Sequence, residues 1–152
     1  MFKKIALIGT FVFLLHQSCA DEVFSPIPNA PVNLILYLHS EDSILNSPLA
    51  YKIFIDKRFA DDQLGYGGIL VVSNGIDSNG EISLFAYDLA CPVEVNKTIK
   101  IAPDDTGKAT CAKCKSVYYI ADGNGAPISG SKYPLKVYKV SPRGNRRYNV
   151  SN

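Results

Sequence analysis

The chain carries the run CAKCKSVYYIADGNGAPISGSKYPL from Cys111 to Leu135, and upstream of it Cys91 stands in the run ACPVE. One cysteine, about twenty intervening residues and then a C-x-x-C pair is the spacing of a site formed by two loops. The residue types leave three interpretations open. Thiolates bind zinc or an iron–sulfur cluster when further ligands are present. A C-x-x-C pair can also be a redox dithiol, and Cys91 can form a structural disulfide with either cysteine in an oxidising compartment.

Residues 1–18 have the pattern of a secretory signal peptide. Two lysines precede an apolar run from Ile5 to Leu15, and polar residues follow it. The apolar run is too short for a permanent transmembrane helix. Cys19 comes next, so the region resembles the lipobox of bacterial lipoproteins, in which the signal is cleaved just before a lipidated cysteine. Ordinary cleavage, with Cys19 as a disulfide partner, is the alternative.

The segment after Cys19 has the composition of a tether. Asp21-Glu22 resembles the surface-export signal of Bacteroidetes-type lipoproteins, and the prolines that follow predict an extended chain, so we expect a lipidated tether over residues 19–29. A lipid anchor holds an otherwise soluble domain on a membrane. We therefore expect a cell-envelope lipoprotein, in the outer membrane or facing the periplasm, with surface exposure as one arrangement.

Residues 30–142 are predicted to form one all-β domain. Apolar and polar residues alternate with a period of two from Val32 to His39, as in a half-buried strand. Short apolar segments and Gly/Asn turns recur along the chain without a long helical pattern, which favours an antiparallel β-sandwich or barrel. We expect a short helical turn within 40–47 and a flexible tail over 143–152. The further predicted strands are 51–56, 69–72, 82–90, 98–102, 108–110, 117–121 and 135–140.

Composition and charge exclude two classes of function. The chain has 16 Lys and Arg against 14 Asp and Glu, and Lys3 and Lys4 of the leader account for the excess. The remainder is neutral and has no basic patch, which argues against nucleic-acid binding. Of the 2 histidines, His16 lies in the leader. His39 alone cannot complete a Ser-His-Asp or Cys-His set, so we expect no enzymatic activity.

The run from Cys111 to Leu135 resembles the cluster-binding region of Rieske iron–sulfur proteins. That family holds a two-iron cluster with Cys-x-His on one loop and Cys-x-x-His on the other. Cys91 and Cys111 match the two cysteines of the family. Ser116 and Tyr118 match the serine and tyrosine that form hydrogen bonds around the cluster. The likeness continues in Gly123, Gly125 and Gly130, in Pro134-Leu135, and upstream in residues 67–71 and 85–88.

The resemblance implies a Rieske-like antiparallel fold in which residues 91–135 form a small cluster-binding subdomain. Both histidine ligands are replaced, by Val93 in the first loop and by Cys114 in the second. Lys115 also replaces a glycine that lets the second loop approach the cluster. With one histidine outside the leader, a single chain cannot supply the family's ligand set.

Two functional hypotheses follow from the resemblance. In the first and favoured one, no cofactor is bound, Cys91 and Cys111 form a disulfide because they are neighbours on one iron in the family, and the domain is a binding or structural module. In the second, Cys91, Cys111 and Cys114 hold an unusual iron–sulfur cluster or a zinc ion, and the protein transfers electrons. Glu94, a water or an outside group would be the fourth ligand. The expected partners are the membrane and an envelope protein or redox partner of unknown identity.

Overall fold

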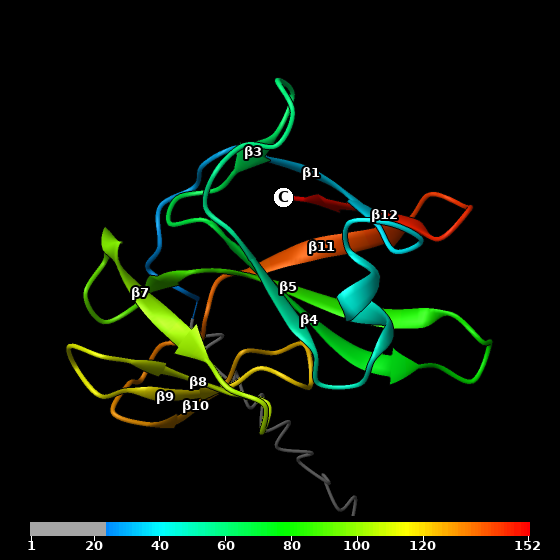
Figure 1. Cartoon of the computed structure of the whole chain (residues 1–152). Coiled ribbons are helices and arrows are strands. Elements are labelled where there is room, and N and C mark those ends of the chain that lie inside the picture. The colour runs from blue at the N-terminus through cyan, green and yellow to red at the C-terminus, as the bar shows by residue number, and fades with distance from the viewer. Residues whose placement is uncertain (1–23) are drawn as a thin grey trace, which may run out of the picture.

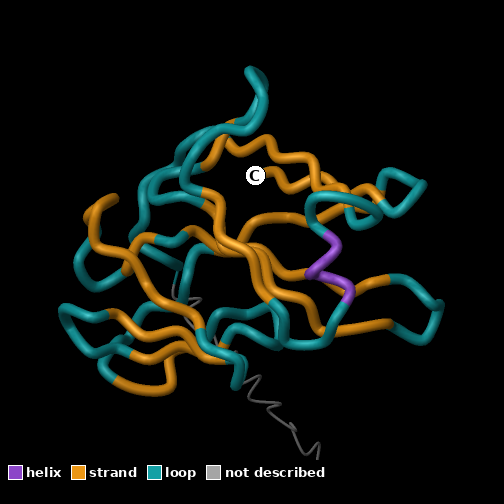
Figure 2. Tube along the Cα trace, viewed as in Figure 1, coloured by secondary structure: helices purple, strands orange, loops and turns teal. Residues whose placement is uncertain are grey.

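The computed structural model describes residues 24–152, which form two antiparallel β-sheets and one short 3-10 helix (Figures 1 and 2). The predicted signal peptide over 1–18, the lipidation site Cys19 and the first residues of the tether lie outside the described residues. The prediction of an all-β domain is confirmed. None of the helices described between residues 24 and 152 is long and apolar enough to span a bilayer.

The larger sheet has seven strands, and each runs antiparallel to its neighbours. Its strands are β1 (Val32–Tyr37), β2 (Tyr51–Phe54), β3 (Gln63–Leu64), β4 (Ile69–Ile76), β5 (Ile82–Asp88), β11 (Val137–Pro142) and β12 (Arg147–Ser151). They lie in the order β2-β4-β5-β11-β12-β1-β3. β1 has the predicted alternation, because Val32, Leu34 and Leu36 are buried and the residues between them are partly exposed. The predicted helical turn is η1 (Ser43–Asn46), which follows β1.

The smaller sheet is an insertion between two paired strands of the larger one. It contains β6 (Ala90–Cys91), β7 (Asn96–Pro103), β8 (Lys108–Cys111), β9 (Val117–Tyr119) and β10 (Pro127–Ser129), in the order β10-β9-β8-β7-β6. The chain leaves the larger sheet at the end of β5 and returns to it in β11, where Val137 lies opposite Tyr87. Figure 1 shows the smaller sheet packed below the larger one. A small subdomain carrying the cysteine loops is therefore present, as predicted.

Two apolar clusters stabilise this arrangement. One lies within the larger sheet and includes Leu34, Leu36 and Val150, and the other joins the two sheets. In the second cluster, Leu70 and Tyr87 of the larger sheet lie with side chains of the smaller sheet. Cys91, Cys111, Ile101, Tyr118, Ile120 and Leu135 belong to this second cluster. Each large side chain buried there contributes about 1.5–3 kcal/mol, so the cysteine loops are fixed by the same core that holds the sheets together.

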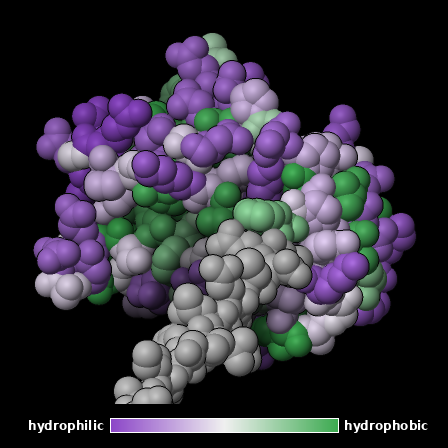
Figure 3. Space-filling view, turned by 180° about the vertical axis from the view of Figure 1, so that it is seen from behind, coloured by the Kyte–Doolittle hydropathy of each residue, from purple (hydrophilic) through white to green (hydrophobic). Residues whose placement is uncertain are grey.

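Both ends of the described chain are held against the domain. The segment 143–152, expected to be a flexible tail, contains β12, which pairs with β1 and β11 and buries Val150. At the other end, Ile27 of the predicted tether is 3% exposed, and Lys136 Nζ donates to Ile27 O at 3.2 Å. Both differences have the same cause, because Ile27 and Val150 are apolar side chains that become buried in the folded domain. Seen from behind, much of the surface is hydrophilic, and an apolar area lies near the middle (Figure 3).

Candidate metal centre

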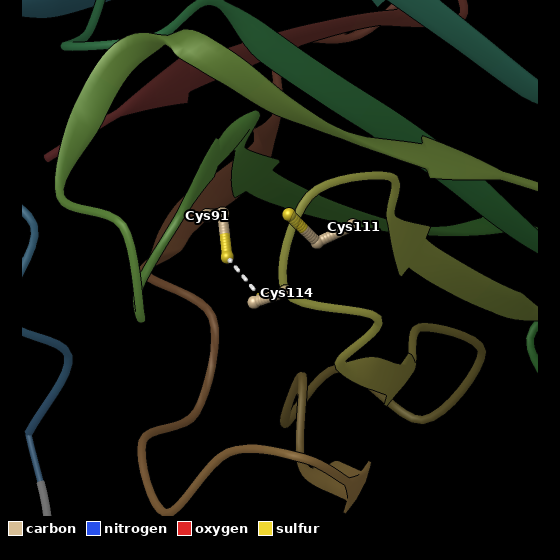
Figure 4. Close-up of side chains that lie close together, drawn as sticks. All are labelled: Cys91, Cys111 and Cys114. Atoms are coloured by element: carbon tan, nitrogen blue, oxygen red, sulfur yellow. Dashed lines mark hydrogen bonds between the residues drawn. The ribbon is translucent and has the colours of Figure 1, made fainter.

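The three cysteines of the described chain converge on one point beside the smaller sheet. Cys91 ends β6, Cys111 ends β8, and Cys114 lies in the turn that follows β8. Their Sγ atoms all lie within 4.8 Å of one another, and the Sγ atoms of Cys91 and Cys114 are 3.5 Å apart. Figure 4 shows the three side chains close together on neighbouring segments, with a dashed line joining Cys91 to Cys114. The fold thus brings together the three residues that the sequence offers as metal ligands.

The two cysteine loops close in the same way. Val95 N donates to Cys91 O at 2.9 Å, and Lys115 N donates to Cys111 O at 3.0 Å. Val95 and Lys115 both have a left-handed backbone, with φ of 47° and 61°. That conformation costs a non-glycine residue roughly 1–2 kcal/mol. Lys115 therefore has a backbone conformation that favours glycine, and the chain holds both loops in a strained left-handed conformation.

Cys91 lies in an environment that disfavours a lone thiolate. Its side chain is fully buried. Burial raises the pKa of the Cys91 thiol to about 11, and the neighbouring thiols add to the increase, although backbone N–H groups of Glu94 and Val93 lower it. A bound cation favours the deprotonated form of a thiol. A metal ion at this point would therefore convert the buried Cys91 thiol to the thiolate that binds it.

Cys114 is the accessible member of the three. It is partly exposed, whereas Cys91 and Cys111 are buried. Burial alone would raise the pKa of the Cys114 thiol, but hydrogen bonds from the hydroxyl and backbone N–H of Ser116 and from the two other thiols outweigh it and lower the pKa. Cys114 Sγ lies 3.1 Å from Ser116 Oγ.

Ser116 and Tyr118 line the same site from the second loop and β9. Both are fully buried, and Tyr118 Oη lies 3.8 Å from Cys91 Sγ. Burial is also the main reason why the pKa of Tyr118 is raised. Gly130 packs directly behind Ser116, where a Cβ would stand 2.9 Å from Ser116 Cα, so no larger residue fits. The Gly-rich stretch after the C-x-x-C pair thus lets the chain cross closely behind the cysteine loop.

Glu94, which the sequence offers as a fourth ligand, has another partner. Its carboxylate lies 2.6 Å from Lys113 Nζ, so the pair links the tips of the two cysteine loops. This contact raises the pKa of Lys113. The group of mutually close ligand atoms comprises Cys91, Cys111 and Cys114, without Glu94. Among the residues that the structure describes, three thiols are therefore the groups that could ligate a metal ion at this point.

The residues do not fit the two-histidine cluster of Rieske proteins. Val93, at the first histidine position, is 41% exposed and has no donor atom. His39 is exposed on the turn after β1, where its ring makes an edge contact with Tyr37 at 6.3 Å between centroids. It does not belong to the group of ligand atoms around Cys111. A donor set of three sulfurs and no nitrogen is chemically different from the Rieske set.

The expected disulfide between Cys91 and Cys111 is not formed in this structure. Cys91, Cys111 and Cys114 are all free thiols. A disulfide needs about 2.05 Å between its sulfurs, and the other neighbouring pair, Cys91 and Cys114, is not bonded either, because their Sγ atoms are 3.5 Å apart. The expectation assumed that two of the thiols would pair, but the loop geometry gathers all three.

Asp88 supports the first cysteine loop and is a residue that sequence reasoning missed. Its buried carboxylate accepts hydrogen bonds from the N–H groups of Tyr66, Gly67 and Ala90 and from the hydroxyl of Tyr138. These bonds join the Gly-rich turn before β4 and the end of β5 to β6, whose last residue is Cys91. An aspartate at a strand end, three residues before a cysteine, was the available signal, but the donors from Tyr66, Gly67 and Tyr138 lie more than twenty positions away in the sequence.

Comparisons with known proteins give a structural likeness and no match to a family model. Neither the scan against family models nor the search of curated proteins gave a match. Among solved structures, the chain is similar to a candidate small subunit of NADH-dependent nitrite reductase from Mycobacterium tuberculosis, with 12% identity and a TM-score of 0.41. The similarity covers 82% of this chain and 96% of that one. A likeness at this level assigns neither fold nor function, which depend here on the residues themselves.

Proposed function

We propose that this chain is an envelope lipoprotein whose Rieske-like domain is a metal-binding module, with Cys91, Cys111 and Cys114 holding one thiophilic ion in place of the two-histidine cluster. The observation that carries the proposal is the convergence of three Sγ atoms within 4.8 Å. Sulfur ligands suit zinc and iron–sulfur chemistry alike, so the size and shape of the group must distinguish them.

The distances between the three cysteine sulfurs favour a single metal ion. Zinc binds thiolate sulfur at about 2.3 Å, and tetrahedral geometry then separates two ligand sulfurs by about 3.8 Å. The Cys91 and Cys114 sulfurs, 3.5 Å apart, and the limit of 4.8 Å for all three lie close to that spacing. A two-iron cluster would distribute the three thiolates over two metal ions, which requires a wider group. Small side-chain movements would therefore be enough to enclose one ion.

The fourth ligand of such an ion would be a group other than the three cysteines. Cys114 is partly exposed, so the side of the site that it occupies is open to water. Three protein ligands with one open position are typical of zinc sites that bind or exchange a further ligand. The module would thus hold its ion through the protein and offer one coordination position to a partner molecule in the envelope.

Electron transfer through an unusual iron–sulfur cluster is the second candidate function. The hydroxyl groups of Ser116 and Tyr118 favour it, because they lie 3.1 Å and 3.8 Å from the sulfurs of Cys114 and Cys91. Hydrogen bonds to cluster sulfurs tune reduction potentials. These contacts favour electron transfer, whereas the spacing of the three sulfurs favours a single ion, so the metal content decides between the two candidates.

The test is the metal content of the full chain, purified anaerobically in mild detergent. One zinc per chain, colourless and free of sulfide, is the expected result. Iron with acid-labile sulfide and visible absorption would select electron transfer, and a metal-free protein that does not take up added zinc would overturn both. Cys111→Ser should abolish binding, whereas Ala112→Ser, which adds a serine in the same turn and removes no ligand, should not.

The envelope location needs a separate experiment. Cells expressing the chain would be labelled with an alkyne fatty acid, and we expect label on the wild-type protein and none on Cys19→Ser. Membrane fractionation of the two proteins gives the second readout. Label on neither protein, together with recovery of the wild type in the soluble fraction, would contradict the lipid anchor without affecting the metal proposal.

A further inference from the structure

Cys91 and Cys114 form a thiol pair in contact. Their sulfurs lie 3.5 Å apart, and a disulfide would need them at about 2.05 Å, so a movement of about 1.5 Å closes the gap. The two residues come from different parts of the chain, because Cys91 ends β6 and Cys114 lies in the turn after β8. A bond between them would therefore join the two loops directly across the site (Figure 4).

The three thiols differ in their access to solvent. Cys91 and Cys111 are buried in the apolar cluster between the sheets, whereas Cys114 is partly exposed at the tip of its turn. Thiol–disulfide exchange requires the incoming disulfide to reach a sulfur atom. Cys114 is the one that an external molecule can reach, and Cys91 Sγ is in contact with it from behind.

We propose that Cys91 and Cys114 are a thiol–disulfide exchange site, in which Cys114 reacts first with a low-molecular-weight disulfide and Cys91 then resolves the product. In the first step the Cys114 thiolate attacks the external disulfide, which forms a mixed disulfide and releases one thiol. In the second step Cys91 attacks the Cys114 sulfur, which forms the internal disulfide and releases the second thiol. The protein loses two electrons and two protons, and the external disulfide takes them up to become two thiols.

Cys111 takes no part in this exchange. It is fully buried, ends a strand, and its N–H and C=O groups are hydrogen-bonded to Ser116 and Lys115 within the turn. Its sulfur would remain a single thiol after oxidation. If the proposed ion is bound, the internal disulfide removes two of its three ligands, so oxidation would release it. That consequence rests on the proposed function, while the exchange itself does not.

The experiment treats the full chain in detergent, freed of metal, with oxidised glutathione and maps its disulfides by peptide mass spectrometry. We expect a peptide joining Cys91 to Cys114 and a free thiol on Cys111. Mapping by peptide keeps Cys19 out of the count. Cys91→Ser should stop at the first step and keep glutathione on Cys114, whereas Cys114→Ser should form neither product.

Controls make each outcome decisive. Cys111→Ser should still form the Cys91–Cys114 disulfide. If Cys91→Ser loses its β-sheet circular dichroism, the apolar replacement Cys91→Val takes its place. A wild-type bond that includes Cys111, or no glutathione on the Cys91 variants, would overturn the proposal. Zinc uptake before and after oxidation is measured separately. Disulfide formation in a protein that never binds zinc would contradict the metal function and leave the exchange site standing.

Discussion

Replacing Asp88 with alanine tests whether a buried carboxylate fixes the cysteine loop. Asp88 is fully buried and accepts from Tyr66 N at 2.8 Å, Gly67 N at 3.0 Å, Ala90 N at 2.7 Å and Tyr138 Oη at 2.6 Å. A hydrogen bond to a charged group contributes about 1.5–3 kcal/mol, and unpaired buried donors carry a further cost. Because the four donors share two oxygens, the effects are not additive, and we expect a loss of about 4 kcal/mol in the free energy of unfolding.

Removing the hydroxyl partner alone should cost much less. Tyr138→Phe deletes one of the four hydrogen bonds and leaves three, for an expected loss of about 1.5 kcal/mol. Burial and the hydrogen bond to Asp88 raise the pKa of Tyr138, so this hydroxyl stays protonated and donates throughout the neutral range. The double variant should be more stable than the sum of the single losses predicts, by about 1–2 kcal/mol, because both changes remove the same bond.

Urea unfolding followed by tyrosine fluorescence and circular dichroism measures these losses. Asp105→Ala is the matched control, since Asp105 is an exposed aspartate on the turn between β7 and β8, and its loss should stay within about 0.5 kcal/mol. A loss of under about 1 kcal/mol for Asp88→Ala would refute the reasoning. Metal uptake by the same variant shows whether the loop that carries Cys91 depends on this carboxylate.

Three further predictions concern other parts of the chain. Lys115→Gly should raise the free energy of unfolding by about 1 kcal/mol in urea, because Lys115 has φ of 61°, while Lys139→Gly in β11 should lower it. Arg58→Met should cost about 2 kcal/mol in the same assay, because it takes one of two cations from the fully buried carboxylate of Asp42, and an unchanged midpoint would contradict this. The pKa of Asp104 is lowered by hydrogen bonds from a threonine hydroxyl and backbone N–H groups, so its contribution is present above the unfolded pKa of about 3.9 and lost as pH falls through the lower folded value. Asp104→Asn should therefore be less stable than wild type at pH 7, with the difference disappearing in strong acid, and a constant difference would speak against it.

Much of the fold was predictable because local patterns and long-range structure agree. The alternation from Val32 onward identifies β1, and the turn residues divide the chain into short strands. The end of the chain was misjudged because Tyr148 and Val150 are only two apolar positions in a polar segment, and their strand forms by pairing with β1 and β11. Such pairing cannot be read from one segment alone, since the partners supply the missing hydrogen bonds.

The candidate site divides in the same way. The sequence by itself determined the donor types: three thiols, no histidine at the loop positions, and the serine and tyrosine that follow, because ligand chemistry is a property of the side chain. Only the tertiary structure decided how these groups combine. It joins Cys91 with Cys111 and Cys114 across two loops, directs Glu94 to Lys113, and leaves the expected Cys91–Cys111 disulfide unformed. Distances between residues twenty or more positions apart are set by sheet packing and by backbone strain at the loop ends, and neither is encoded in the local spacing of the cysteines.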